Sequence, residues 1–182
     1  VEPYNVRLWG VGNENWGCGG SYDVATYGKE YIRYATMIRH TTKLNTPGRR
    51  LADMEDVHAL TDVTGFGLLG HLNEICLGSR LRATVDLKAI PLLPGVETRV
   101  GEGFVTGASG RNWAGYGQHV QLNGVSDAMQ ALLTDPQTSG GLLVACAPAA
   151  VPEVLKIFAD EGFERASVIG RLEAGSGIVV EG

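Results

Sequence analysis

The sequence has few cysteines, no concentration of basic residues and no long apolar run, and each shortage excludes a class of protein. Three widely separated cysteines are too few for a disulfide framework or a cysteine zinc site, which favours a reducing compartment. No apolar run approaches the ~18 residues that a membrane-spanning helix requires. With a net charge of −5 and no basic cluster, the chain lacks the footprint of a nucleic-acid-binding protein. We therefore expect a cytoplasmic protein that binds neither membranes nor nucleic acid.

The remaining composition is that of a globular protein with many turns. Hydrophobic residues make up 44% of the 182 residues and charged residues 19%, so the chain can bury a core. The 26 glycines follow no triplet period and therefore mark turns. The N-terminus, Val1-Glu2-Pro3, has neither Met nor a signal pattern, so we expect it to lie inside a longer protein.

The chain divides into a short N-terminal segment and one larger domain. Residues 1–20 predict a strand followed by a loop, and residues 22–39 have the apolar spacing of a helix. A new series of elements begins after this helix. We therefore place a boundary between a strand–loop–helix appendage, 1–36, and a domain, 37–182.

The larger segment mixes strands and helices without strict alternation, which indicates an α+β layered fold. The stretch 91–124 is rich in Gly, Pro and Asn, and we expect it to be irregular with short helices. Apolar periodicity and turn residues predict the other elements: helices at 68–77, 126–133 and 151–161, strands at 58–63, 83–87 and 142–147, and a closing strand pair at 167–172 and 177–181.

A first dense motif, TDVTGFGLLGH, runs from Thr61 to His71. It contains GxGxxG between a predicted strand and a predicted helix, with Asp86 ending the next strand, which is the pattern of a dinucleotide-binding fingerprint. Against that interpretation, polar residues interrupt the strand, whereas a Rossmann first strand is a continuous apolar run. Asp62 would also repel a pyrophosphate unless a metal ion stood between them, so metal-mediated phosphate contact is the better functional interpretation. The structural alternative is that Asp62 caps the turn.

A second dense motif, LLTDPQTSGGLL, begins at Leu132. Its Asp-Pro pair ends the preceding helix, because proline disfavours helical geometry in the residue before it. The polar residues 137–139 supply donors and acceptors, and Gly140-Gly141 allow a close approach. Packing against a neighbouring strand is the favoured role of this glycine pair, and contact with a ligand is the alternative.

These two motifs, the run AIPLLPGV at 89–96, and Arg111-Asn112 followed by Tyr116-Gly117 together resemble selenophosphate synthetase (selenide, water dikinase) over about 37–182. The resemblance implies a layered α+β sandwich, the C-terminal domain shared with aminoimidazole ribonucleotide synthetase. That family makes selenophosphate from ATP, selenide and water, with magnesium. The resemblance also implies that Asp62 is a metal ligand, while the other metal carboxylates and the catalytic cysteine or selenocysteine belong to the N-terminal half.

We find no counterpart of those groups in this chain and assign no catalytic residue. The resemblance therefore implies a phosphotransferase domain that binds ATP and Mg²⁺ only together with an N-terminal ATP-binding domain. A rival hypothesis is a non-catalytic interaction module whose exposed apolar face drives homodimerisation. A third is the dinucleotide-binding domain discussed above.

The three cysteines and His71 are not expected to be catalytic. Cys76 and Cys146 fall in a predicted helix and strand, where a free cysteine behaves as a small hydrophobe. Cys18 has no lysine in the ten residues after it, so it does not match the catalytic cysteine and nearby lysine that the resemblance places in the N-terminal half. His71 is expected to be a helix-surface or core residue rather than a catalytic one.

Residues 1–36 resemble a fragment of a retaining α-L-arabinofuranosidase, which gives the sequence a chimeric character. The resemblance would make Glu14, in Asn13-Glu14, the general acid/base of a (β/α)₈ barrel. A retaining glycosidase also needs a nucleophilic carboxylate about 5–5.5 Å away, and the later strand that carries it has no counterpart here. A glycoside hydrolase fragment is therefore the last of our functional alternatives.

Overall fold

The computed structural model describes residues 43–137 and 139–182. The chain divides into two units, Val1–Leu44 and Asn45–Gly182, and the following concerns the second. The strand–loop–helix expected over 1–36, with Glu14 and Cys18, lies outside the described residues, and so does Thr138 of the second motif.

A four-stranded sheet forms one layer of this unit, with the strand order β3-β6-β2-β5. β2 (Leu81–Asp86) runs parallel to β6 (Gly177–Glu181) and antiparallel to β5 (Gly170–Ala174), and β3 (Val120–Asn123) runs parallel to β6 at the edge. The sheet therefore combines parallel and antiparallel pairs, as an α+β fold allows.

One face of this sheet is buried. Ala83 and Val85 of β2 lie beside Ile178 and Val180 of β6, and all four are at most 2% exposed. The residues between them are half-buried or exposed. This alternation is typical of a sheet that is covered on one face.

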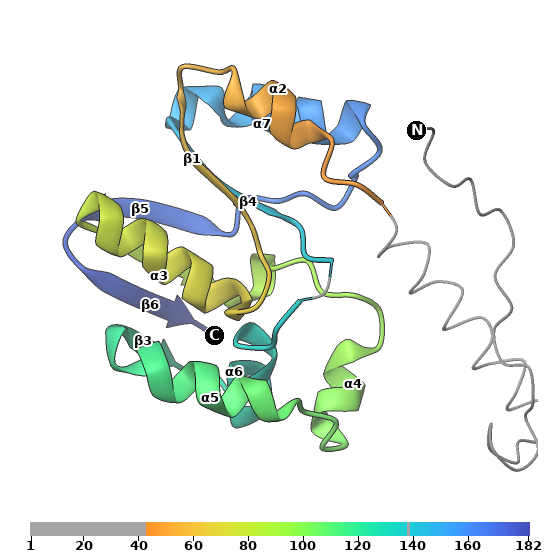
Figure 1. Cartoon of the computed structure of the whole chain (residues 1–182), viewed down its shortest axis with the longest axis vertical. Coiled ribbons are helices and arrows are strands. Elements are labelled where there is room, and N and C mark those ends of the chain that lie inside the picture. Colours follow the sequence, from red (N-terminus) through yellow and green to blue (C-terminus); the bar gives the residue numbers. More distant parts are fainter. Residues whose placement is uncertain (1–42, 138) are drawn as a thin grey trace, which may run out of the picture. The chain divides into compact units, whose positions relative to one another are not determined.

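The helix α3 (Gly67–Ser79) packs on β2 and β6, and α5 (Gly107–Tyr116) and α6 (Asp127–Leu133) lie beside it (Figure 1). Leu69, Leu72 and Cys76 recur at helical spacing and enter the same core as the sheet residues. The hydroxyl of Ser126 caps α6 by accepting a hydrogen bond from the Met129 N–H at 3.3 Å.

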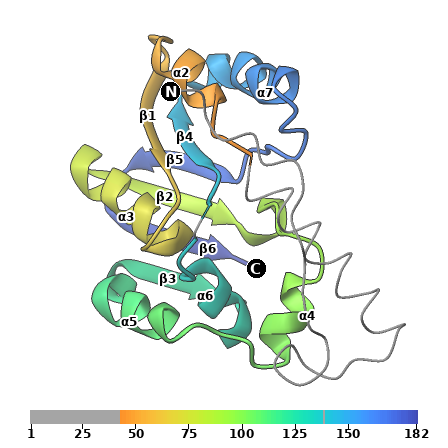
Figure 2. The ribbon, with the colours of Figure 1, turned by 45° about the vertical axis from the view of Figure 1, so that its right-hand side comes forward.

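A second, two-stranded sheet joins β1 (Val57–Asp62) antiparallel to β4 (Leu142–Cys146). The helices α2 (Pro47–Ala52) and α7 (Val151–Asp160) lie side by side at one end of this unit and cover the two-stranded sheet (Figure 2). Leu142 and Val144 pack in the apolar cluster formed by α2 and α7, whereas Leu143 packs in the cluster beneath α3. The continuous apolar run of β4 is thus explained by burial on both faces.

The shorter elements connect these layers. α4 (Val96–Gly101) packs near α6, and the described part of the chain also contains three 3₁₀ turns: η1 (Leu87–Ala89), η2 (Gly117–His119) and η3 (Pro148–Ala150). No helix in the described ranges, 43–137 and 139–182, is long and apolar enough to cross a membrane.

The prediction of a closing strand pair is wrong in one respect. β5 and β6 both form, but they flank β2 and do not pair with each other. Gly175 and Ser176 connect them past the start of β2, where a Cβ on Gly175 would lie 3.1 Å from the Cβ of Arg82. The strand β3 falls in the stretch that was expected to be irregular.

Candidate functional site

Asp62 is the last residue of β1, opposite Leu142 in the ladder, and its side chain is exposed. The hydroxyl of Thr61 donates to the Asp62 backbone carbonyl at 3.1 Å, but within residues 43–137 and 139–182 the carboxylate has no hydrogen-bond or ion-pair partner. The turn that follows is closed by the Gly67 N–H, which donates to the Thr64 carbonyl at 3.1 Å. The interpretation of Asp62 as a turn cap is therefore wrong, and the carboxylate is free to meet a ligand.

The loop after Asp62 is held by the second motif. The Val63 N–H donates to the Gly141 carbonyl at 2.9 Å, and the Gln137 N–H donates to the Thr64 carbonyl at 3.0 Å. A Cβ on Gly140 would lie only 1.6 Å from the Val63 carbonyl oxygen. Packing is thus confirmed as the role of Gly140, since its missing side chain allows the backbones of the two motifs to touch.

Two glycines of the first motif, Gly67 and Gly70, also face protein, whereas a Cβ on Gly65 would meet nothing within 4 Å. Gly67 has φ +68°, and a Cβ there would lie 2.6 Å from the Thr134 carbonyl carbon. A Cβ on Gly70 would lie 2.8 Å from a ring carbon of Tyr116. Because β1 and β2, the strands before and after α3, lie in different sheets, the motif also lacks the parallel βαβ unit of a dinucleotide fold. The dinucleotide-binding hypothesis is therefore wrong, and the carboxylate of Asp86 accepts instead from the Lys88 N–H.

Asn112 on α5 joins the two motifs, a role that the sequence did not reveal. Its side-chain Nδ2 donates to the carbonyls of Gly65 and Thr134, each at 2.9 Å. Nearby, the carboxylate of Asp135 accepts from the hydroxyls of Thr106, the N-cap of α5, and Ser109, in its first turn. The sequence pointed to Asn112 only through the family resemblance of the Arg111–Gly117 run, and that run does not by itself indicate which contacts the side chain makes.

His71 is buried within the first motif, with 7% of its surface exposed, which confirms the structural expectation. Its Nε2 lies 3.2 Å from the Thr64 hydroxyl, and its ring lies 5.7 Å from the ring of Phe66. Its Nδ1 approaches Glu74 Oε2 to 3.4 Å without hydrogen-bond geometry. These contacts attach the start of α3 to the loop that follows Asp62.

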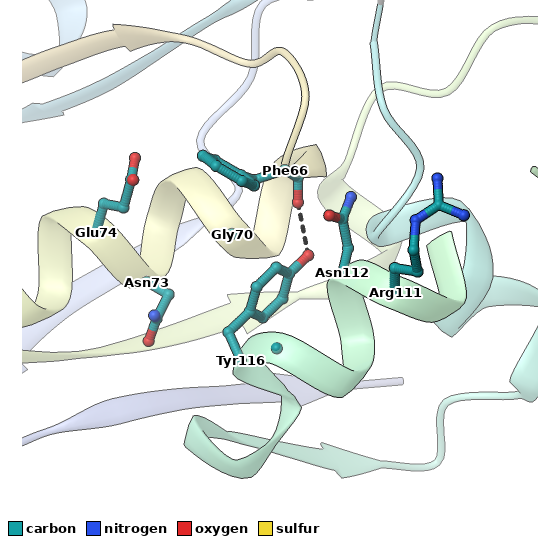
Figure 3. A pocket seen from close by; sticks show the side chains of 8 residues that line it. Phe66, Gly70, Asn73, Glu74, Arg111, Asn112 and Tyr116 are labelled. Carbon is teal, nitrogen blue, oxygen red and sulfur yellow. Dashed lines mark hydrogen bonds between the residues drawn. The ribbon is translucent and has the colours of Figure 1, made fainter. Parts of the chain in front are cut away.

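Tyr116 lies beside this turn and forms one wall of a pocket between α3 and α5 (Figure 3). Its hydroxyl donates to the Phe66 carbonyl at 2.6 Å. Burial raises the pKa of Tyr116 to about 12, although a backbone hydrogen bond at Gly70 partly opposes this effect. The phenol is therefore a fixed, neutral structural group at ordinary pH.

The two described cysteines are structural as expected. Cys76 is 2% exposed, and burial raises the pKa of its thiol. Burial, followed by the charge of Asp56, also raises the pKa of half-buried Cys146. Both shifts disfavour the reactive thiolate.

A magnesium ion fits Asp62 only as one ligand of a larger site. Magnesium takes near-octahedral oxygen coordination, with waters and substrate phosphates around one or two carboxylates. The unpartnered carboxylate suits that role. However, no group of three or more His, Cys, Asp or Glu side chains within residues 43–137 and 139–182 could enclose a metal ion. Further ligands would have to come from outside these residues.

Comparisons with known proteins agree on the larger unit. The family described as AIR synthase related protein, C-terminal domain, matches residues 39–182. Over 144 residues, the chain is 58% identical to a selenide, water dikinase of Pseudomonas straminea, which covers 79% of this chain and 40% of that protein. A selenide, water dikinase of Burkholderia pseudomallei is 61% identical over 144 residues, or 79% of this chain and 41% of that protein. The chain thus spans about 40% of the length of these relatives.

A solved structure supports the fold. The hydrogenase maturation protein HypE of E. coli superimposes with a TM-score of 0.51 and 19% identity, over 77% of this chain and 36% of that one. At this identity the likeness concerns the fold alone, and it agrees with the predicted layered α+β domain. The comparisons do not bear out the resemblance of residues 1–36 to an arabinofuranosidase.

Proposed function

Because the chain belongs to the AIR synthase related protein family through residues 39–182, we propose that it contributes the C-terminal domain of a selenide, water dikinase. The reaction would convert ATP, selenide and water into selenophosphate, AMP and phosphate. The observation that carries the proposal is the Asp62 carboxylate, which has no partner among residues 43–137 and 139–182 and ends a strand whose following loop is interlocked with the second motif. The identity of 58–61% to relatives of that name supports it.

In this proposal Asp62 supplies one oxygen ligand to magnesium. When bound, the ion would neutralise charge on the phosphates during phosphoryl transfer. The contribution of the chain itself is positional. Gln137 and Asn112 fix the backbone at Thr64 and Gly65, so the Asp62 carboxylate is held at the strand end without being tied to a neighbour.

The site would be completed by an N-terminal ATP-binding domain, because one carboxylate cannot position ATP and selenide. Residues 39–182 alone are therefore expected to be inactive. We also propose that the natural location is the cytoplasm and that the domain boundary lies near residue 37. The boundary predicts that residues 39–182, produced alone, unfold at the same urea midpoint as the larger unit of the full chain.

The proposal is tested by joining the N-terminal half of the Pseudomonas straminea relative to residues 39–182. Selenide-dependent formation of AMP from ATP and Mg²⁺ is measured under reducing conditions. In the active hybrid, Asp62→Asn is expected to lower the rate by at least ~100-fold, the scale for losing one electrostatic stabiliser. Asp53→Asn is the matched control, since Asp53 is exposed at the end of α2. An unchanged rate in Asp62→Asn would contradict the proposed ligand.

Association is the second part of the proposal, either as a homodimer or with the N-terminal domain. The observation that favours it is the exposure of neighbouring apolar side chains after α4, with Phe104 69% and Val105 46% exposed. Gel filtration with light scattering should give a concentration-dependent mass that falls in a Phe104→Ser variant. A concentration-independent monomer would contradict self-association.

A further inference from the structure

His71 is a buried histidine that contacts the turn following Asp62. It lies in the second turn of α3, and only 7% of its surface is exposed. Burying a polar ring costs free energy unless its nitrogens are hydrogen-bonded. The groups that face the two ring nitrogens therefore indicate what a histidine does at this position.

The two ring nitrogens of His71 face different groups. Nε2 lies 3.2 Å from the hydroxyl oxygen of Thr64. Nδ1 is inaccessible to solvent and has no hydrogen-bond partner among residues 43–137 and 139–182, but it lies 3.4 Å from Oε2 of Glu74. Buried polar atoms are nearly always paired, so this nitrogen calls for an explanation. The Glu74 side chain is 62% exposed, so a small rotation can bring its carboxylate into line with an Nδ1–H group.

The Glu74 carboxylate determines which nitrogen of His71 carries the proton. A neutral imidazole has one N–H donor and one acceptor nitrogen. A protonated Nδ1 directs its N–H toward the carboxylate, whereas an unprotonated Nδ1 would direct a lone pair at a negative charge. Electrostatics therefore favours the tautomer with the proton on Nδ1. In that tautomer Nε2 can only accept, and the Thr64 hydroxyl donates to it.

Thr64 anchors the turn after Asp62 on both sides. Its carbonyl accepts from the Gly67 N–H at 3.1 Å and from the Gln137 N–H at 3.0 Å. These two bonds join its backbone to the start of α3 and to the second motif, and the bond to His71 fixes its side chain as well. Asp62 lies only two residues earlier, and its carboxylate has no partner in the described part of the chain. The placement of this carboxylate therefore depends on the turn that Thr64 anchors.

We propose that His71 is a positioning residue for Asp62, which acts by accepting the Thr64 hydroxyl proton on Nε2 while Nδ1–H faces Glu74. The inference rests on the proposed function, because Asp62 is the residue that would bind magnesium. His71 touches no reacting group and acts only through the turn. Groups that orient a metal ligand from behind typically account for about 10–100-fold in metal affinity or activity.

The tautomer is tested on the full chain without metal. Long-range ¹H–¹⁵N NMR of the imidazole, assigned by the signals lost in His71→Gln, should show a protonated Nδ1 and an unprotonated Nε2. Glu74→Ala should move part of the proton to Nε2, because the carboxylate that favours Nδ1–H is gone. A proton on Nε2 in the parent protein would overturn the proposal.

Amide hydrogen exchange in the full chain tests whether His71 holds the turn. In His71→Leu, the N–H groups of Gly67 and Gln137 should exchange at least ~5-fold faster, the scale for losing one hydrogen bond. The control is the Ala147 N–H, which donates to the Asp56 carbonyl at 2.9 Å and should exchange as in the parent. His71→Gln should restore slow exchange, because its side-chain oxygen replaces Nε2 as the acceptor. Equal acceleration at Ala147 would show that His71 contributes only to overall stability, which would overturn the proposal.

The hybrid enzyme connects the turn to the metal. The Mg²⁺ concentration that gives half-maximal AMP formation should rise about 10-fold in His71→Leu and in Thr64→Val, and it should return towards the parent value in His71→Gln and Thr64→Ser. Mn²⁺ binding, followed by electron paramagnetic resonance, should weaken by the same factor without depending on turnover. His58→Gln, at an exposed histidine of β1, is the matched control and should change neither value.

The outcomes separate this proposal from the proposed function. If His71→Leu and Thr64→Val bound Mn²⁺ like the parent hybrid, the positioning role would be overturned, and if His71→Leu did not fold, Thr64→Val would decide. A folded hybrid that made no AMP with His71 in place would contradict the proposed function. In that case the tautomer and the hydrogen exchange of the full chain would still decide whether His71 holds the turn.

Discussion

Gly67 lies directly against the backbone of Thr134, so close that a Cβ on Gly67 would be 2.6 Å from the Thr134 carbonyl carbon. Each residue belongs to one of the two dense motifs, which are far apart in the sequence and interlocked in the fold. Gly67, one of the glycines that suggest a phosphate loop, is therefore required for contact between the two motifs. Asp62, at the edge of this contact, keeps a carboxylate that no other described residue binds.

Replacing Gly67 by Ala should strongly destabilise the larger unit. A left-handed backbone costs an L-residue roughly 1–2 kcal/mol, and overpacking adds about 1–3 kcal/mol, so we expect a total loss of roughly 2–5 kcal/mol in urea unfolding. Gly65→Ala is the matched control, because a Cβ there meets nothing within 4 Å. Equal stability of the two variants would contradict the interlock.

Replacing Asn112 by Ala should cost about 1–3 kcal/mol, because two hydrogen bonds worth roughly 1 kcal/mol each are lost and two carbonyls lose their donor. The measurement is again urea unfolding. Gln121→Ala removes an exposed amide that, among the described residues, bonds only Asn123, and it should change stability by less than ~0.5 kcal/mol. If both variants behaved alike, Asn112 would not join the two motifs.

Tyr116 should make stability fall at alkaline pH. Its pKa is raised to about 12 in the folded chain from 10, so the folded state retains the phenol proton that the unfolded state loses. The contribution is complete below pH 10 and is lost as the pH rises towards 12. Allowing for partial exposure, it amounts to about 1–2 kcal/mol. Tyr116→Phe should flatten the stability profile in this window, and an unchanged profile would contradict the prediction.

Cys76 should be inert in the folded protein, because its thiol is buried and its pKa is raised. In a variant that retains Cys76 as its only cysteine, reaction with a disulfide reagent at pH 8 should become fast only in denaturing urea. Rapid modification under native conditions would show that α3 opens readily.

Local patterns predicted most elements of the larger unit. Leu69, Leu72 and Cys76 gave α3 its helical period, and the apolar run of Leu142–Cys146 predicted a buried strand. The edge strand β3 was missed because Val120–Asn123 is short and half polar. The predicted pairing of the last two strands was wrong because consecutive strands joined by a short connection usually form a hairpin, whereas here β2 lies between β5 and β6.

Long-range contacts were beyond sequence reasoning. The exposed carboxylate of Asp62 was identified from its position at a strand end, a local property. The roles of Asn112 and Gly140 depend on contacts with Gly65 and Val63, 47 and 77 positions away along the chain. No periodicity or spacing within either segment contains that information.

Production of AMP from ATP and Mg²⁺, with and without selenide, tests the central claim most directly when three proteins are compared. These are the full chain, residues 39–182, and the hybrid with the N-terminal half of the Pseudomonas straminea relative. We predict selenide-dependent AMP from the hybrid and none from the other two. Selenide-dependent AMP from residues 39–182 alone, or none from a folded hybrid, would contradict the claim that this domain is one half of a composite site.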